Sequence, residues 1–343
     1  MSTELGKEFI FGPQPPFASC HASHLTLLPD GDILAAWFAG SKEGADDTAI
    51  WGARRRQGSW SEPFVLADEL DEPYWNPVFH RKANGELVLF YKVGRLLKQW
   101  RTLFKVSADN GLTWSAPQEL VEGDQGGRGP VRNKLIVLAD GTWLAPASTE
   151  DGIWQAFTDR STDEGRSWTR SGDIRIQDID YSRIESVTGS EIPVSDQSFY
   201  GRGVIQPTLW ESEPGHVHML LRSTEGRIYR SDSADSGQTW CDAYPTELPN
   251  NNSGIDVVKL DQGTLALVYN PVGTNWGPRT PLSLSFSTDN GKTWGGTIVL
   301  EQEEGEYSYP AIIANGPELF ITYTWRRTSI AFRHGRLPVM PDA

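Results

Sequence analysis

The chain has 343 residues, of which 38% are hydrophobic and 22% charged, and it contains 14 Trp, 13 Phe and 10 Tyr. This aromatic content excludes a disordered or fibrous chain, because it is enough to build a sizeable core. The net charge of −14 argues against binding to nucleic acid or to an anionic membrane surface, both of which require a cationic face. An anionic ligand in a local basic pocket remains compatible with this charge.

The N-terminal residues 1–17 lack the charged segment and apolar run of a secretory signal, and no stretch reaches the ~18 apolar residues of a membrane span. We therefore expect a soluble, cytoplasmic protein, and nothing in the sequence indicates its oligomeric state. Cys20 and Cys241 are the two cysteines, and no CxxC motif or histidine cluster accompanies them. With no calcium-loop spacing either, we expect no metal and no cofactor.

One eight-residue pattern, Ser-x-Asp-x-Gly-x-(Thr/Ser)-Trp, occurs four times along the chain. The copies lie at residues 107–114, 161–168, 233–240 and 287–294, and a degenerate fifth copy ends at Trp60. The final tryptophans are spaced by 54, 54, 72 and 54 residues, which predicts a repeating unit of about 54 residues. Within each copy, Ser and Asp are expected to cap a tight turn and Trp to pack between sheets, so the four aspartates are predicted to be structural.

A second periodic series consists of hairpin turns that end in glycine and are flanked by alternating apolar residues. The six glycines are Gly31, Gly85, Gly141, Gly215, Gly263 and Gly316. Units of roughly 50 residues with enough alternation for four strands match the blades of a β-propeller. We therefore predict an all-β fold, a six-bladed β-propeller of four-stranded antiparallel blades, formed by residues 1–343 as a single domain.

The repeated box resembles the Asp-box (BNR repeat) of the sialidase, or neuraminidase, superfamily. The resemblance implies a six-bladed propeller over nearly the whole chain. It also implies a glycosidase with three arginines that clamp a sugar carboxylate, a tyrosine nucleophile assisted by a glutamate, and an acid/base aspartate. Asp-boxes also occur in propellers with other activities, so the box specifies the fold more closely than the function.

Propellers bind ligands at the mouth of the central channel, where the innermost strands begin. With the six turns in register, these strand starts are unusually polar for buried strands. The candidate ligand-binding residues on or near this mouth are Asn76, Lys92, Arg132, Lys134, Glu150, Gln206, Asn252 and Asn270. Their cations form a local basic funnel in an acidic chain, which favours an anionic sugar.

Several residues match the family's catalytic pattern. Arg222 and Arg279, each ahead of an Asp-box, are similar to the second and third arginines of the triad, and Arg132 is expected to join them on the carboxylate. Tyr307, in Glu-Tyr-Ser-Tyr-Pro, is similar to the nucleophile, with Tyr309 as the alternative. The acid/base aspartate is matched loosely by Asp46 or Asp47.

Two positions depart from the family's pattern. Where the family has its first arginine, this chain has His21 and His24, and the place of the assisting glutamate holds Gln206, whose amide cannot accept the tyrosine's proton. His21, His24 and His80 are therefore candidate proton-transfer groups.

We expect a sialidase-like glycosidase that acts on a carboxylate-bearing sugar, as an exo-acting enzyme on small oligosaccharides. A uronate-directed lyase is the first alternative, because the same cations would neutralise a uronate carboxylate while a tyrosine or histidine removes the neighbouring proton. A non-catalytic carbohydrate-binding propeller is the second alternative, and Gln206 is the observation that motivates it.

Overall fold

The computed structural model describes residues 5–181 and 201–337, which fold almost entirely into β-strands. Their one helical element is a 3-10 turn, η1 (Leu97–Gln99). Within these ranges no helix has the length and apolar character needed to cross a membrane. The predicted all-β class is therefore confirmed.

The strands form antiparallel sheets that follow one another along the chain. The first sheet contains β2 (Ser19–Leu27), β3 (Ile33–Gly40), β4 (Ala49–Arg56), β5 (Ser59–Trp60) and β6 (Phe64–Ala67). The second contains β7 (Tyr74–Arg81), β8 (Leu87–Val93), β9 (Arg101–Ser107) and β10 (Gln118–Glu119). Each of these sheets begins with a hairpin at one of the predicted turns.

The third sheet has eight strands in two groups. The first group is β11 (Ile136–Val137), β12 (Trp143–Asp151), β13 (Ile153–Ser161) and β14 (Thr169–Arg170), and the second is β15 (Arg202–Glu213), β16 (His216–Ser223), β17 (Arg227–Ser233) and β18 (Tyr244–Pro249). Only a short parallel pairing of β13 with β15, through Ile153 and Trp154, joins the two groups.

The last two sheets bring the ends of the chain together. One contains β19 (Asp256–Lys259), β20 (Leu265–Tyr269), β21 (Leu282–Ser287) and β22 (Gly295–Glu301). The other contains β23 (Tyr307–Asn315), β24 (Glu318–Trp325) and β25 (Ser329–Arg336), and the N-terminal strand β1 (Gly6–Phe9) pairs antiparallel with β25.

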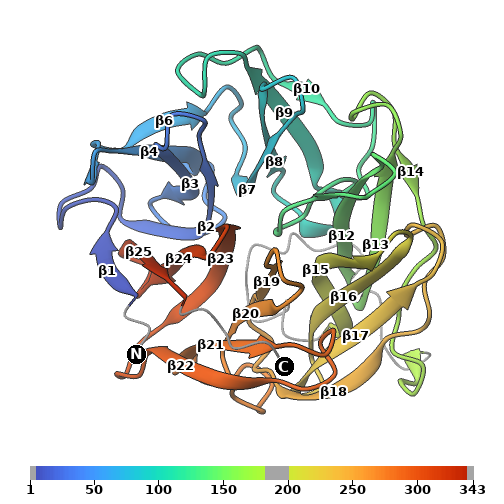
Figure 1. The fold of residues 1–343 in the computed structure, drawn as a ribbon. Coiled ribbons are helices and arrows are strands. Elements are labelled where there is room, and N and C mark those ends of the chain that lie inside the picture. Colours follow the sequence, from blue (N-terminus) through green and yellow to red (C-terminus); the bar gives the residue numbers. More distant parts are fainter. Residues whose placement is uncertain (1–4, 182–200, 338–343) are drawn as a thin grey trace.

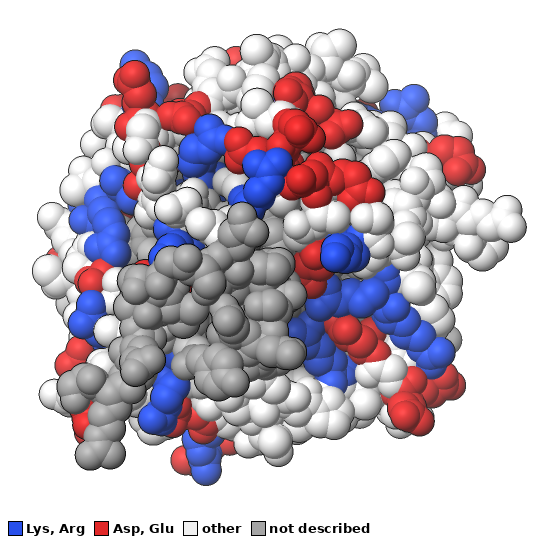
Figure 2. All heavy atoms as spheres, turned by 180° about the vertical axis from the view of Figure 1, so that it is seen from behind, with Lys and Arg blue, Asp and Glu red and all other residues white. Residues whose placement is uncertain are grey.

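Figure 1 shows these sheets arranged in sequence order around a common centre. β2 packs against both β7 and β23, so the first sheet neighbours the second and the last. The hydrophobic clusters lie between neighbouring sheets: Leu34 and Phe38 of β3, for example, share a cluster with Phe79 of β7 and Leu89 of β8. On the face shown in Figure 2, acidic and basic side chains are interspersed.

The four Asp-boxes adopt the same hydrogen-bonded turn, as predicted. In the first, Thr113 N and Leu112 N donate to Asp109 Oδ1 at 2.8 and 3.1 Å, and Gly111 N donates to Ser107 Oγ at 2.8 Å. The bonds from Thr113 and Ser107 lower the pKa of Asp109 to about 2. The box aspartates are therefore structural caps, and they lie outside the cavity described below.

Candidate active site

A cavity of about 80 Å³ lies where several innermost strands begin. Its described lining residues are Glu43, Trp75, Asn76, Leu97, Trp100, Glu150, Trp154, Gln206, Arg222, Trp276, Arg279, Tyr309 and Arg327. Four tryptophans and three arginines are among them, so the lining combines aromatic surface with cationic groups, a composition suited to an anionic ligand.

Strand bulges aim three of these residues into the cavity. The pairing register of β7, β15 and β23 with their hairpin partners shifts at Asn76, Gln206 and Tyr309. All three residues have positive φ, 43°, 51° and 50°, and each precedes a proline, where an α conformation is disfavoured. Backbone strain of this kind is retained where surrounding structure over-determines it, and it clusters at functional sites.

Arg222 is held by neutral partners only. Its Nη1 donates to Tyr309 Oη at 2.7 Å and to Gln206 Oε1 at 3.1 Å, and its Nε donates to Asn252 Oδ1 at 3.0 Å. The side chain is 2% exposed and has no ion-pair partner among the described residues. A buried cation without a counterion is a strong site for a ligand carboxylate, because the ligand supplies the missing charge.

Arg279 and Arg327 both pair with one carboxylate oxygen of Glu306. Arg279 Nη1 is 2.7 Å and Arg327 Nε is 2.6 Å from Glu306 Oε1, and Arg327 also pairs with Glu43. Burial raises the pKa of Glu306, but the two guanidiniums outweigh it and the net pKa is lowered. Glu306 is therefore a fixed carboxylate that orients both arginines towards the cavity.

Tyr309 lies at the centre of this cationic group. The guanidinium carbons of Arg132, Arg222 and Arg279 are 5.3, 5.6 and 5.6 Å from its ring centroid. Arg132 is buried behind it, and its Nη2 donates to the carbonyls of Tyr309 and Pro310. Burial lowers the pKa of Arg132 to about 10. The sequence predicted that Arg132 would contact the substrate carboxylate; in the structure it holds the backbone at Tyr309 and does not line the cavity.

Glu150 is the second carboxyl group among the lining residues, beside Glu43. Burial raises its pKa, and this effect outweighs the opposing influence of Arg222 and of a hydrogen bond from Gln206. Glu150 therefore holds its proton to higher pH than an ordinary glutamate. A carboxyl group whose pKa is raised is suited to proton donation.

The His21 ring also packs against Tyr309, with ring centroids 4.1 Å apart and ring planes tilted by 47°. Its Nδ1 is 2.8 Å from Thr324 Oγ1, and its Nε2 is buried with no partner in the described chain. Burial, reinforced by Arg327 and Arg279, lowers the pKa of His21 well below its usual value. The imidazole is therefore neutral beside the tyrosine.

The structure corrects the assignment of the nucleophile to Tyr307. That side chain is 1% exposed and its hydroxyl is 3.1 Å from Arg326 Nη2, outside the cavity, whereas Tyr309 lines the cavity. In a regular strand, Tyr307 and Tyr309 would point to the same face, because side chains two positions apart share a face. The bulge between Ser308 and Ala311 breaks this alternation and turns the Tyr309 side chain into the cavity.

The predicted acid/base aspartates also lie outside. Asp46 is exposed and its Oδ1 is 2.8 Å from Arg95 Nε, while Asp47 accepts hydrogen bonds from Ser41 N and Oγ. Glu43, on the same loop, is the carboxylate that reaches the cavity.

His24 and His80, two of the predicted proton-transfer residues, are packed in the interior and away from the cavity. His24 Nδ1 accepts a hydrogen bond from Phe79 N at 3.3 Å, in a buried position, and burial lowers its pKa. His80 packs edge-on against Trp143 with centroids 4.2 Å apart, and burial lowers its pKa to about 4. Neither lines the cavity.

Three residues predicted to bind the ligand, Lys92, Lys134 and Asn270, do not line the cavity and bind other protein groups. Lys92 Nζ donates to Thr102 Oγ1 and to the Gly127 carbonyl, and burial lowers its pKa to about 7. Lys134 Nζ pairs with Asp256 at 2.7 Å. Asn270 Nδ2 donates to the carbonyls of Pro281 and Tyr307. Of the predicted set, the structure brings together Asn76, Glu150, Gln206, Arg222, Arg279 and Tyr309 as lining residues, with Arg132, His21 and Asn252 directly behind them.

Sequence reasoning missed Arg327, Glu43, Glu306 and the role of Trp154. For Tyr309 a signal existed: aligning the prolines at 77, 207 and 310 places Tyr309 in register with Asn76 and Gln206. For Arg327 no signal existed, because its neighbour Arg326 is the same residue type and points elsewhere.

Comparison with known proteins assigns the family. The model of the BNR repeat-like domain matches residues 31–321, so the chain belongs to this family. This confirms the resemblance to the sialidase superfamily. Among curated proteins, none matches the sequence.

Solved structures share the fold. The Hadza microbial sialidase Hz136 superposes with a TM-score of 0.72 at 16% identity, covering 93% of this chain and 66% of that one. A leech intramolecular trans-sialidase gives 0.72 at 14% identity, covering 96% and 70%. A protein of unknown function from Dyadobacter fermentans DSM 18053 gives 0.74 at 14% identity, covering 97% and 98%. The chain thus spans about two thirds of the length of these sialidases, and at such identities the likeness establishes the fold.

Proposed function

We propose that this chain is a sialidase-like glycosidase whose cavity binds the carboxylate of an acidic sugar, with exo action on small oligosaccharides. The observation that carries the proposal is the convergence of Arg222, Arg279 and Arg327 around Tyr309 in one cavity. Guanidinium groups bind carboxylates in a planar, bidentate manner, and tryptophan faces pack on sugar rings.

The proposal includes a six-bladed propeller formed by residues 1–343 as one domain. The five sheets give six blades when the eight-stranded sheet is divided at the short parallel pairing of β13 with β15. Pairing of β1 with β25 then completes the last blade with the N-terminal strand.

In the proposed mechanism, Tyr309 Oη attacks the anomeric carbon and forms a glycosyl-enzyme bond. Its phenolic proton passes to the Glu43 carboxylate, and the bond to the leaving oxygen breaks as that oxygen takes the proton of Glu150. Arg222, which donates to Tyr309 Oη, stabilises negative charge there and offers its other edge to the substrate. Water then releases the sugar by the reverse proton transfers.

A lyase is the second candidate, and His21 is the observation that favours it. His21 packs against Tyr309 with the ring planes tilted by 47°, its imidazole is neutral, and its Nε2 has no partner in the described chain. In the lyase reaction this nitrogen would accept a proton from a carbon next to a neutralised carboxylate. In that reaction Tyr309 protonates the leaving oxygen, and no glycosyl-enzyme bond forms.

The test is to incubate the protein with a fluorogenic sialoside and a panel of uronate-capped oligosaccharides, following release of the fluorophore and ultraviolet absorbance of an unsaturated uronate. Release of fluorophore or sugar that disappears in Tyr309→Phe supports the glycosidase. An absorbance rise that disappears in His21→Gln supports the lyase. Binding of acidic sugars without any turnover would overturn both and favour the non-catalytic propeller.

A further inference from the structure

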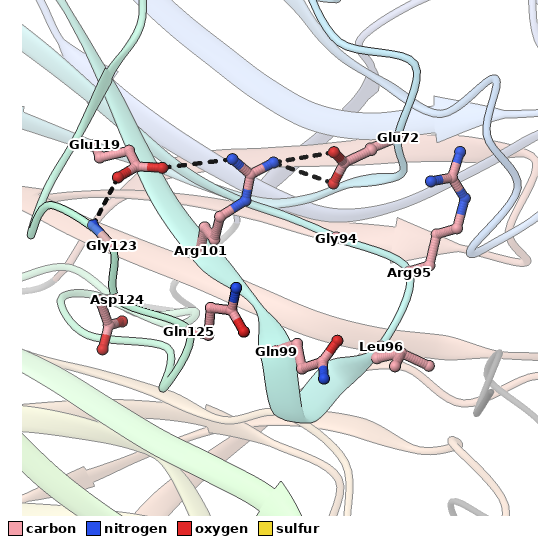
Figure 3. A pocket seen from close by; sticks show the side chains of 10 residues that line it. All are labelled: Glu72, Gly94, Arg95, Leu96, Gln99, Arg101, Glu119, Gly123, Asp124 and Gln125. Carbon is pink, nitrogen blue, oxygen red and sulfur yellow. Dashed lines mark hydrogen bonds and ion pairs between the residues drawn. The ribbon is translucent and has the colours of Figure 1, made fainter. Parts of the chain in front are cut away.

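The cavity shown in Figure 3 has a volume of about 560 Å³, and charged side chains that pair with protein groups line it. Arg101 is held between Glu72 at 3.0 Å and Glu119 at 3.4 Å. Arg95 Nε is 2.8 Å from Asp46 Oδ1. The charge of these arginines is therefore compensated within the protein. A reactive arrangement of side chains lies elsewhere, at the end of β15 that is far from the active-site cavity.

Three neighbouring strands of one sheet bring Ser212, His218 and Asp232 together. Ser212 belongs to β15, His218 to β16 and Asp232 to β17. Ser212 Oγ is 2.7 Å from His218 Nε2, and His218 Nδ1 is hydrogen-bonded to Asp232 Oδ1. A hydroxyl, an imidazole and a carboxylate joined in this order have the geometry of a serine-type catalytic triad, which occurs on unrelated folds.

Asn290 fixes the tautomer of His218. Trp210 Nε1, which only donates, is 2.7 Å from Asn290 Oδ1, so the amide nitrogen of Asn290 faces His218 Nε2, at 3.0 Å. An amide nitrogen also only donates, so Nε2 is an acceptor and the imidazole proton is on Nδ1. Arg230 Nη2 is 3.0 Å from Nδ1 as well, but the contact of Nδ1 with the Asp232 carboxylate is closer and requires that proton. Nε2 therefore accepts the proton of the serine hydroxyl.

The imidazole and the carboxylate are both held in place. The His218 ring is stacked on the indole of Trp210, with centroids 5.2 Å apart and planes at 30°. Burial raises the pKa of Asp232, but its hydrogen bonds outweigh burial and lower the pKa to about 2. The donors are His218, Tyr244 and Arg230. Asp232 is thus a fixed carboxylate that stabilises the imidazolium formed when Nε2 takes a proton.

The other Asp-box units show that the fold does not require a histidine at this place. His218 pairs across the sheet with Asp232, the residue before the Asp-box serine. The pairs at the same place in the other three units are Val88 with Val106, Leu144 with Arg160, and Ala266 with Phe286. An apolar residue therefore satisfies the fold where His218 stands, and the combination of histidine and aspartate is particular to this sheet.

Ser212 lies in a bulge near the surface. The pairing of β15 with β16 shifts between Glu211 and Glu213, so Ser212 is an additional residue. Bulges re-aim side chains and are frequent next to active sites. Ser212 is half-buried, and Glu213 and Pro214 after it are exposed, so the turn is open to solvent. Ser212 is six positions after Gln206 of the active-site cavity, which corresponds to about 20 Å along the strand.

Two donors beside the serine are able to stabilise an oxyanion. Lys259 Nζ donates to the carbonyls of Glu211 and Ser212 at 2.7 and 3.1 Å, which places an ammonium next to the serine. The second N–H of the Asn290 amide has no acceptor among the residues that the structure describes. Donors of this kind stabilise the negative charge that develops on a carbonyl oxygen during acyl transfer.

We propose that Ser212, His218 and Asp232 form a second catalytic site, a serine hydrolase site that cleaves esters of short, uncharged acyl groups. Ser212 Oγ attacks the carbonyl carbon of the ester while its proton passes to His218 Nε2. The bond to the alcohol oxygen breaks as that oxygen takes the proton from Nε2, which leaves an acyl-serine. Water then gives a proton to Nε2 and attacks the acyl-serine, the carboxylic acid leaves, and the proton returns to Ser212. The surface turn and the flanking Glu211 and Glu213 favour an acyl group that is short and carries no negative charge.

The labelling experiment treats the full chain with a fluorophosphonate, which reacts covalently with activated serines, and maps the labelled peptide by mass spectrometry. The label should be on Ser212, and His218→Gln should slow labelling at least tenfold, because the serine then has no base. Ser115→Ala is the matched control, since this exposed serine donates to a backbone carbonyl and not to a histidine. It should be labelled as the unmodified chain is. No label on Ser212 of the unmodified chain, or an equal rate in His218→Gln, overturns the proposal.

The kinetic experiment follows hydrolysis of para-nitrophenyl acetate. Ser212→Ala removes one half-buried hydroxyl and should lower kcat/KM at least tenfold, whereas Ser115→Ala should leave kcat/KM unchanged. Equal hydrolysis by Ser212→Ala and the unmodified chain would overturn the proposal. Neither experiment uses a glycoside, so both results are independent of the proposed function.

Discussion

Tyr309 Oη accepts a hydrogen bond from Arg222 Nη1 at 2.7 Å, although the two residues are 87 positions apart in the chain. The bond joins two segments whose geometry is otherwise unusual: Tyr309 has positive φ before Pro310, and Arg222 is a buried guanidinium with neutral partners. A positive φ before proline and a buried charge without a counterion each cost folding free energy. Their combination at one cavity is expected of a preorganised reactive group.

The first prediction separates the two tyrosines. Tyr309→Phe should reduce kcat by at least about 10³-fold, because the phenolic oxygen is the proposed nucleophile. Tyr307→Phe is the matched control, two residues away. It removes a hydroxyl whose described hydrogen bonds come from Arg326, and kcat should stay within about threefold. Steady-state kinetics on the substrate found in the initial screen checks this, and a larger loss in Tyr307→Phe would return the nucleophile to that position.

The second prediction uses the adjacent arginines. Arg327→Lys should raise KM about tenfold or more, because a single ammonium cannot replace the planar contacts to Glu43 and Glu306 while also facing a carboxylate. Arg326 does not line the cavity, so Arg326→Lys is the matched control. It should change KM less than about twofold. Equal effects of the two substitutions would contradict the assignment of Arg327 to the carboxylate site.

The third prediction concerns Glu150 and pH. Its raised pKa means that the folded protein binds a proton more tightly than the unfolded chain, so stability falls as pH rises from the ordinary glutamate range through the raised value. Glu150→Gln should therefore increase stability at neutral pH and make it less dependent on pH in this window. In the same variant kcat should fall roughly 10²-fold and the alkaline limb of the kcat profile should disappear. Denaturant unfolding and pH profiles check the two parts separately.

The repeated Asp-boxes and the glycine turns predicted the sheet architecture well because they are local features. Asp109 is capped by residues within four positions of it, so its surroundings can be read from the sequence. Hairpins at Gly31, Gly85 and Gly141 follow from turn chemistry and alternation in the same way. The all-β class therefore needed no long-range information.

The site was predicted less well because it is assembled from residues far apart in the chain. Glu43 and Arg327 meet across 284 positions, and nothing in either segment indicates the other. Lys92 and Lys134 were predicted from their place near the channel mouth, but Lys92 Nζ donates to the Gly127 carbonyl and Lys134 pairs with the buried Asp256 of β19. A register argument places a side chain near the mouth, but bulges and buried ion pairs decide whether it faces the cavity.

The last prediction tests the buried histidines through acid stability. Burial lowers the pKa of His80 to about 4, so below its unfolded pKa of 6.5 the unfolded chain takes up a proton that the folded protein does not. Stability is therefore lost as pH falls through this window, by about 2 kcal/mol from His80 at pH 5. His21 and His24, whose pKa values are also lowered, act in the same direction.

His80→Gln removes this titration while keeping a polar side chain against Trp143. Although the substitution is expected to lower stability at pH 7 through lost packing, the difference in unfolding free energy between pH 7 and pH 5 should shrink by about 2 kcal/mol relative to the unmodified chain. His216→Gln, at an exposed position, should leave that difference unchanged. Denaturant titrations at the two pH values give both quantities. An undiminished difference in His80→Gln would show that His80 is protonated in the folded protein at pH 5, and would contradict its placement as a neutral packing residue.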